Sequence, residues 1–176
     1  MVFLHLSIKL ENMRRELFIL RHAKSSWSEV DKSDKDRALK PKGIKDIANL
    51  TKVVKNTVKN LDLIITSPAN RAVHTSVLFA EGIGFPMEKI LLNKKIYDAD
   101  EAMIQAVISN QSADIKSLMI VGHNPTLSYF VNSFLPEPIF ELPTSGFVCL
   151  YFDTADWASI KNSSLVEFNT SFILTE

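Results

Sequence analysis

Two histidines and two arginines of this chain follow directly or closely on short apolar segments. They are Arg21 and His22 after the run at 17–20, Arg71 after the run at 61–66, and His123 after the run at 118–121. Apolar runs of this length are typical of buried strands, and in open α/β sheets ligand chemistry collects beyond the carboxyl ends of the strands. If the three runs are parallel strands joined by helical crossovers, their ends face the same side of the sheet. We therefore expect two imidazoles and two guanidiniums to converge there.

A pocket with this much positive character indicates an anionic ligand. A multiply charged anion offsets the cost of gathering cations, and a phosphoryl group is the natural candidate. Arg71 lies in the first turn of an expected helix, where a cation opposes the helix dipole, so a bound anion would explain its placement. A neutral imidazole could attack phosphorus in line while fixed donors offset the charge on the equatorial oxygens. His22 would have to be neutral to attack, and the two arginines lower its pKa.

Other chemistries fit these residues less well. A lone histidine after a strand is often a buried structural side chain whose hydrogen bonds are made within the protein. This structural role is the alternative to a catalytic one for His123. A metal site is disfavoured because the histidines lack paired spacing and the arginines repel a cation. The chain contains no G-x-S-x-G motif of a serine hydrolase. A module that only recognises phosphate is the non-enzymatic alternative, although Arg or Lys would serve binding without His22.

The segments that must position these residues alternate between apolar runs and amphipathic stretches. Strands are expected at 17–20, 61–66, 90–92, 118–121 and 146–152, with one or two edge strands in the tail. Helices are expected to start at Pro41, Ser67-Pro68, Asp98 and Asn124-Pro125. Ser, Asp and Asn are favoured helix caps, and Pro favours the first helical position. This alternation predicts an α/β fold of three layers, a mostly parallel sheet flanked by helices on both faces.

Composition places the chain among globular proteins. Of its 176 residues 46% are hydrophobic and 23% are charged, which fits one domain over residues 1–176. Lys+Arg and Asp+Glu number 20 each, so the net charge does not indicate a nucleic-acid partner. The single Cys149 lies in an apolar run and is expected in the core. The sequence does not indicate an oligomeric state.

The N-terminal segment is expected to add little to this domain. No run in the chain is long enough to cross a bilayer, and residues 1–12 lack the cleavage site of a signal peptide. We therefore expect no membrane partner and a cytoplasmic location. Met13 is a candidate natural start, which would leave residues 1–12 as a loosely attached extension.

Three blocks of the sequence, in this order, resemble the histidine phosphatase superfamily, which has the phosphoglycerate-mutase-like fold. The blocks are Arg21-His22, Ser67-x-x-x-Arg71-Ala72-x-x-Thr75 and Gly122-His123-Asn124-Pro125. The short chain, and Arg37-Ala38-Leu39 ahead of Gly43, resemble its small SixA-type phosphohistidine phosphatase branch. The resemblance covers roughly residues 16–152.

The resemblance implies a role for each matching residue. His22 would be the nucleophile that becomes phosphorylated, and Arg21, Arg71 and His123 would bind the phosphoryl oxygens. Further phosphate or substrate contacts are expected from Ser25, Arg37, Ser67 and Asn124. The resemblance implies neither a metal nor a cofactor. The expected substrate is a phosphorylated protein histidine or a small phosphorylated molecule.

The chain departs from the larger superfamily members at the general acid. Their glutamate before an aromatic residue is replaced here by Lys94, and Asp98 is the candidate substitute, with Asp100 and Glu101 as alternatives. A protonated phosphoimidazole leaves as neutral imidazole, whose conjugate acid has a pKa of about 6.5, whereas an alkoxide leaves badly without a proton. The lack of a strong general acid therefore favours phosphohistidine over alkyl phosphates as the substrate. A small-metabolite phosphatase or a phosphoglycerate-type mutase is the alternative, but these normally need a larger lid.

Overall fold

The computed structural model describes residues 14–26, 33–139, 141–161 and 164–171. The expected extension at 1–12 and the candidate start Met13 lie outside these residues. The strands are β1 (Arg14–Arg21), β2 (Leu63–Thr66), β3 (Ile90–Leu92), β4 (Ser117–Gly122), β5 (Phe147–Asp153) and β6 (Leu165–Ser171). The helices are α2 (Pro41–Val54), α3 (Asn70–Ile83), α4 (Glu101–Ser109) and α5 (Thr126–Asn132), with short 3-10 turns η1 (Asp34–Asp36), η2 (Met87–Lys89) and η3 (Lys94–Ile96).

The strands form one six-stranded sheet in the order β3-β2-β4-β1-β5-β6. The pairs β2–β3, β2–β4 and β1–β4 are parallel, whereas β5 and β6 add an antiparallel edge next to β1. The register places Arg21 opposite Gly122 and Thr66 opposite Val121. The three strands that carry the predicted chemistry are therefore neighbours, and their carboxyl ends lie at one edge.

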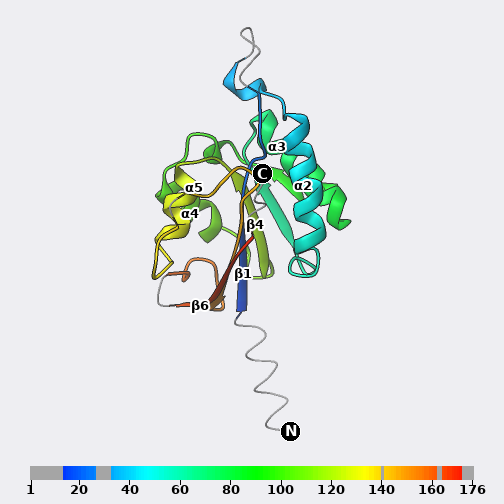
Figure 1. Cartoon of the computed structure of the whole chain (residues 1–176). Helices are drawn as coiled ribbons and strands as arrows, with labels where there is room; N and C mark the ends of the chain where they lie inside the picture. Colours follow the sequence, from blue (N-terminus) through cyan, green and yellow to red (C-terminus); the bar gives the residue numbers. More distant parts are fainter. Residues whose placement is uncertain (1–13, 27–32, 140, 162–163, 172–176) are drawn as a thin grey trace.

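Helices cover both faces of this sheet, which confirms the predicted three-layer α/β fold (Figure 1). Alternate residues of β1 point to opposite faces, as the pleat requires. Leu17 and Ile19 pack in the apolar cluster that includes α4 and α5, and Phe18 and Leu20 pack in the one that includes α2 and α3. Both clusters are fully buried around the central strands, so the strand ends rest on a rigid base.

Three helices begin later than the sequence predicted, and two of the expected caps, Ser67 and Asn124, make tertiary contacts instead. Helix α3 begins at Asn70, and the Ser67 hydroxyl instead accepts the Ala69 N–H and contacts His123. Helix α5 begins at Thr126, after a cis Asn124-Pro125 bond. The side-chain amide of its predicted cap, Asn124, instead donates to the Leu142 carbonyl. Helix α4 is capped by Asp100, whose carboxylate accepts the Met103 N–H at 2.7 Å, and not by Asp98. At Ser67 and Asn124 a tertiary contact therefore competed with the local cap.

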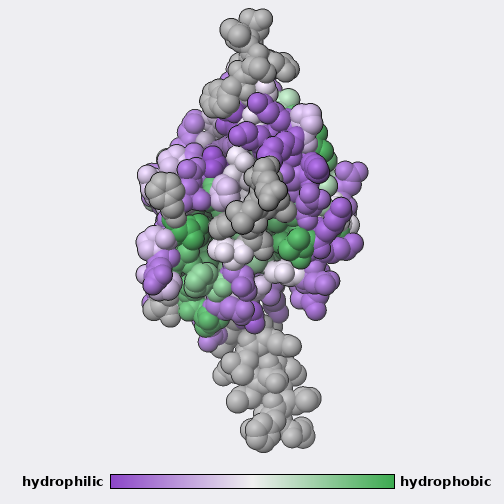
Figure 2. All heavy atoms as spheres, viewed as in Figure 1, coloured by the Kyte–Doolittle hydropathy of each residue, from purple (hydrophilic) through white to green (hydrophobic). Residues whose placement is uncertain are grey.

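The surface over η1, α2 and α3 is dominated by hydrophilic residues (Figure 2). The predicted core residue Cys149 is buried in β5, and burial raises the pKa of its thiol to about 12. In the part of the chain that the structure describes, no helix has both the length and the apolar composition to cross a membrane.

Candidate active site

His22 lies immediately after β1, where hydrogen bonds to β4 and to α3 hold the backbone in place. Its backbone N–H donates to the Gly122 carbonyl at 3.1 Å, and the next N–H, of Ala23, donates to the Thr75 hydroxyl of α3 at 3.0 Å. The Nδ1 atom lies 2.9 Å from the Ala23 carbonyl oxygen. A carbonyl can only accept, so this contact places the proton on Nδ1 and leaves the lone pair on Nε2. The geometry therefore prepares Nε2 for nucleophilic attack.

His123 follows β4 and lies beside His22, with ring centroids 5.1 Å apart. Its Nε2 is 2.8 Å from the Ser67 hydroxyl, and its Nδ1 is buried without a hydrogen-bond partner among the described residues. The edge of the Tyr97 ring packs against it at a centroid distance of 5.6 Å. The ends of β1, β2 and β4 therefore meet at these rings, as the sequence predicted.

Both imidazoles are neutral near physiological pH. Burial lowers the pKa of His22 to about 4, and the guanidiniums of Arg71 and Arg21 act in the same direction. Burial also lowers the pKa of His123 to about 3, with His22 and the arginines adding to the effect. A neutral His22 keeps a lone pair on Nε2, so the electrostatics agree with the tautomer.

Arg21 is held in place by the segment that leads into β5. Its Nη1 donates to the Glu141 carboxylate and to the Leu142 carbonyl, both at 2.7 Å. The Asn124 amide donates to the same two groups, at 3.2 Å and 2.8 Å. The hydrogen bond from Asn124 and the charge of Arg21 keep the pKa of Glu141 below its usual range. Asn124 thus reinforces the contacts that orient Arg21.

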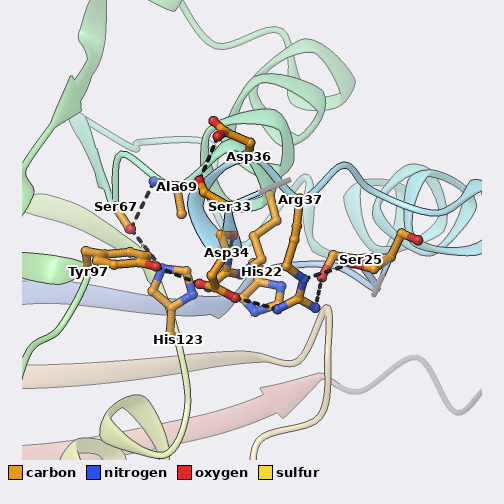
Figure 3. Close-up of polar contacts among 12 residues, drawn as sticks. His22, Ser25, Ser33, Asp34, Asp36, Arg37, Ser67, Ala69, Tyr97 and His123 are labelled. Carbon is orange, nitrogen blue, oxygen red and sulfur yellow. Dashed lines mark hydrogen bonds and ion pairs between the residues drawn. The ribbon is translucent and has the colours of Figure 1, made fainter. Parts of the chain in front are cut away.

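Asp34, at the start of η1, binds the two other arginines of the site, Arg71 and Arg37. Its carboxylate accepts from Arg71 Nη2 and from Arg37 Nη1, each at 2.9 Å, and its backbone carbonyl accepts from Arg71 Nη1 at 2.6 Å. Arg37 also donates to the Ser25 hydroxyl at 2.8 Å. In Figure 3 the Asp34 carboxylate lies between Tyr97 and Arg37. The Asp34 carboxylate is therefore an internal anion that binds Arg71 and Arg37, two arginines expected to contact the substrate.

Tyr97 completes the contacts of this carboxylate. Its hydroxyl donates to Asp34 at 2.6 Å, and its ring lies 5.9 Å from the Arg71 guanidinium. The hydrogen bond from Tyr97, followed by those from Arg37 and Arg71, lowers the pKa of Asp34 well below its usual range, and the same contact raises the pKa of Tyr97. Asp34 is therefore ionised at neutral pH.

Most of the predicted residues line one cavity of about 490 Å³. Its walls are formed by Arg21, His22, Lys24, Ser25, Asp34, Arg37, Lys40, Arg71, His123, Asn124 and Thr144. Two predicted residues do not belong to this lining. Ser67 is fully buried behind His123, so its geometry suits holding that ring and not touching a substrate. Asp98 is exposed outside the cavity, as are the alternatives Asp100 and Glu101.

The sequence did not single out Asp34, Tyr97 or Glu141. Asp34 stands three residues before Arg37, a spacing at which opposite charges can meet, and this was the only local signal for it. Tyr97 and Glu141 reach the site from η3 and from the connection before β5, which no local pattern places near the strand ends.

Known proteins share this sequence pattern and this fold. Residues 17–91 match the model of the histidine phosphatase superfamily (branch 1). An uncharacterised chloroplastic protein of Arabidopsis thaliana is 31% identical over 121 residues, a match that spans 64% of this chain and only about half, 56%, of that protein.

Solved structures give the same result over more of the chain. The structure of a putative phosphohistidine phosphatase SixA from Agrobacterium tumefaciens matches with a TM-score of 0.70 and 26% identity, covering 77% of this chain and 90% of that one. The protein histidine phosphatase SixA complexed with tungstate also matches with a TM-score of 0.70, at 18% identity, over 89% of this chain and 94% of that one. Together with the family match, these neighbours support phosphatase activity on phosphorylated substrates. Residues 17–91 thus carry the sequence pattern of the histidine phosphatase superfamily, and the chain has the fold of the SixA structures.

Proposed function

We propose that this protein hydrolyses phosphohistidine through a covalent phosphoryl intermediate on His22. The observation that carries the proposal is the hydrogen bond from His22 Nδ1 to the Ala23 carbonyl, because it directs the free lone pair of Nε2 into a cavity lined by arginines. A ring that only bound phosphate would serve better with a proton on the nitrogen that faces the anion. This argument favours an enzyme over a phosphate-recognition module.

The reaction proceeds in two displacements at phosphorus. In the first, the Nε2 lone pair of His22 forms a bond to phosphorus, and the bond from phosphorus to the leaving group breaks. In the second, water attacks phosphorus, the phosphorus–Nε2 bond breaks with its electron pair returning to Nε2, and the proton of water passes to solvent. Arg21, Arg71 and His123 line the cavity with His22, so they would contact the phosphoryl oxygens, where preorganised donors stabilise the charge of the transition state.

Arg37, Ser25 and Asn124 act around this centre. Arg37 donates a hydrogen bond to the Ser25 hydroxyl on one wall of the cavity. There both side chains can contact the phosphoryl group or the rest of the substrate. Asn124 positions Arg21 through their shared acceptors. Ser67 positions His123 in the same way, through its hydroxyl.

The chemistry of the leaving group favours a nitrogen–phosphorus bond. The carboxylate bound to Arg71 and Arg37, that of Asp34, is ionised and has no proton to give to an alkoxide. The solved structure at 26% identity is that of a putative phosphohistidine phosphatase SixA, which agrees with this substrate. A small-metabolite phosphatase would need a proton donor at the leaving group, and this makes it the second candidate.

The lining of the cavity also favours hydrolysis without a metal. Three guanidiniums and two lysines border the cavity and repel a cation. Among the residues that the structure describes, His, Cys, Asp and Glu side chains form no group of three suited to hold a metal ion.

The proposal is tested by hydrolysis of phosphohistidine and of p-nitrophenyl phosphate with and without a chelator. We expect turnover to survive the chelator and to disappear in His22→Ala. His74→Ala is the matched control, because His74 lies on α3 outside the cavity and its variant should keep full activity. Turnover that needs an added metal, or that persists in His22→Ala, would contradict the proposal, and phosphate binding without turnover would favour the recognition module.

A further inference from the structure

The depth of each charged group in the cavity fixes the direction in which a leaving group departs. His22 is 9% exposed and Arg71 is 7% exposed at its side chain, so both lie at the floor. The side chain of Asp34 is 43% exposed although it binds Arg71 and Arg37, so its carboxylate lies nearer the mouth. In-line displacement places the leaving group opposite the nucleophile. A leaving group therefore departs toward the mouth, past the carboxylate of Asp34.

This carboxylate is held in one position by several donors. The Oδ2 atom accepts from Tyr97 and from Arg71, and Oδ1 accepts from Arg37. These donors come from three separate residues, so the position of the carboxylate does not depend on one of them. A fixed negative charge beside the path of the leaving group affects nitrogen and oxygen leaving groups in opposite ways.

A phosphoimidazole leaves with its second ring nitrogen protonated. That form carries a positive charge before the phosphorus–nitrogen bond breaks, and the electron pair of the bond then neutralises it. A nearby carboxylate stabilises the protonated form and increases its population. When a phosphate ester reacts, negative charge develops on the leaving oxygen, and the same carboxylate repels it.

We propose that Asp34 is a specificity-determining residue that favours cleavage of nitrogen–phosphorus bonds over oxygen–phosphorus bonds. This inference rests on the proposed phosphatase function and deepens it, because it assigns the choice of substrate class to one side chain. Asp34 acts as an ionised acceptor for the protonated leaving imidazole. It is therefore not a substitute for the general acid that the sequence led us to seek at Asp98.

The test compares kcat/KM for N-phosphorylimidazole and for phenyl phosphate in the wild type and in Asp34→Asn. The readout is the ratio of the two values, because any common effect on the arginines or on phosphoryl affinity cancels from it. We expect the ratio to fall about tenfold or more in Asp34→Asn, the size of effect that one nearby charge has on a protonation equilibrium. Asp36→Asn is the matched control, since its carboxylate lies in the same turn but accepts from the Ser33 hydroxyl and does not line the cavity.

Each other outcome overturns the inference. An unchanged ratio, with both rates altered by one factor, would show that Asp34 only orders or blocks the arginines. A larger loss on phenyl phosphate than on N-phosphorylimidazole would show that Asp34 is a general acid for oxygen leaving groups. In both cases wild-type turnover that depends on His22 would leave the proposed function standing, whereas a wild type inactive on both substrates would contradict the function itself.

Discussion

The protonation of two histidines links the chemistry of this site to the stability of the fold. His22 and His123 are enclosed at the floor of the cavity, where burial disfavours the charged imidazolium more than any single neighbour does. The arginines that would hold a phosphoryl group add to this effect. The burial that keeps His22 neutral therefore also destabilises the folded protein in acid.

We expect acidification to destabilise the protein through these two rings. Unfolded histidine binds a proton below about 6.5, whereas folded His22 and His123 stay neutral down to a pKa of about 4 and about 3. Between those limits the unfolded state holds more protons. The free energy of unfolding should thus fall as the pH falls, by up to roughly 1.4 kcal/mol per pH unit for each histidine. Urea unfolding between neutrality and about pH 5 measures this slope.

The double variant His22→Gln/His123→Gln provides the control for this slope. Its unfolding free energy should depend less on pH over the same interval, because the two titrating rings are gone. A slope that is the same in wild type and variant would show that other groups set the acid sensitivity.

At the scale of elements, the start of α2 is packed directly against the chain that leaves β1. A Cβ on Gly43 would lie 2.5 Å from the Lys24 carbonyl oxygen and 3.2 Å from the Ala23 Cβ. The same carbonyl accepts the Lys40 N–H at 2.8 Å. The absence of a side chain at Gly43 therefore lets the helix fix the segment that follows His22.

Gly43→Ala is expected to reduce catalysis as well as stability. Relief of the overlap must move the backbone at Lys24, which should destabilise the fold by about 1–3 kcal/mol and displace the His22 ring. Gly84→Ala is the comparison, because Gly84 has φ 78° at the end of α3 with open space around it and lies outside the cavity. It should cost about 1 kcal/mol and leave kcat/KM unchanged. Equal kcat/KM values for the two variants would contradict the role given to Gly43.

The same elements explain how far the sequence could lead. The apolar runs that end at His22 and His123 predicted their strands, because a buried strand needs little more than its own side chains to be recognised. The caps at Ser67, Asp98 and Asn124 were predicted wrongly. Ser67 and Asn124 instead bind partners that the tertiary fold offers, and α4 is capped by Asp100 in place of Asp98. Asp34 stayed hidden for the same reason: its contacts depend on the path of a polar loop, which no periodicity constrains.

Over the whole molecule, the strand order creates a local charge that the composition conceals. The chain has equal numbers of acidic and basic residues, yet three arginines and two lysines line a single cavity. The neighbouring positions of β1, β4 and β2 bring Arg21 and His123 together from residues far apart in sequence. The family match and the fold fit a site built for a phosphoryl group at this edge of the sheet.

The central claim is the covalent phosphoryl group on His22, and trapping it is the most direct test. The protein is mixed with N-phosphorylimidazole, quenched within the first turnover under alkaline conditions that preserve phosphohistidine, and mapped by peptide mass spectrometry. We expect one added phosphoryl group on the peptide that contains His22, and none on it in His22→Ala. Turnover without a label, or a label on His123 in place of His22, would contradict the account.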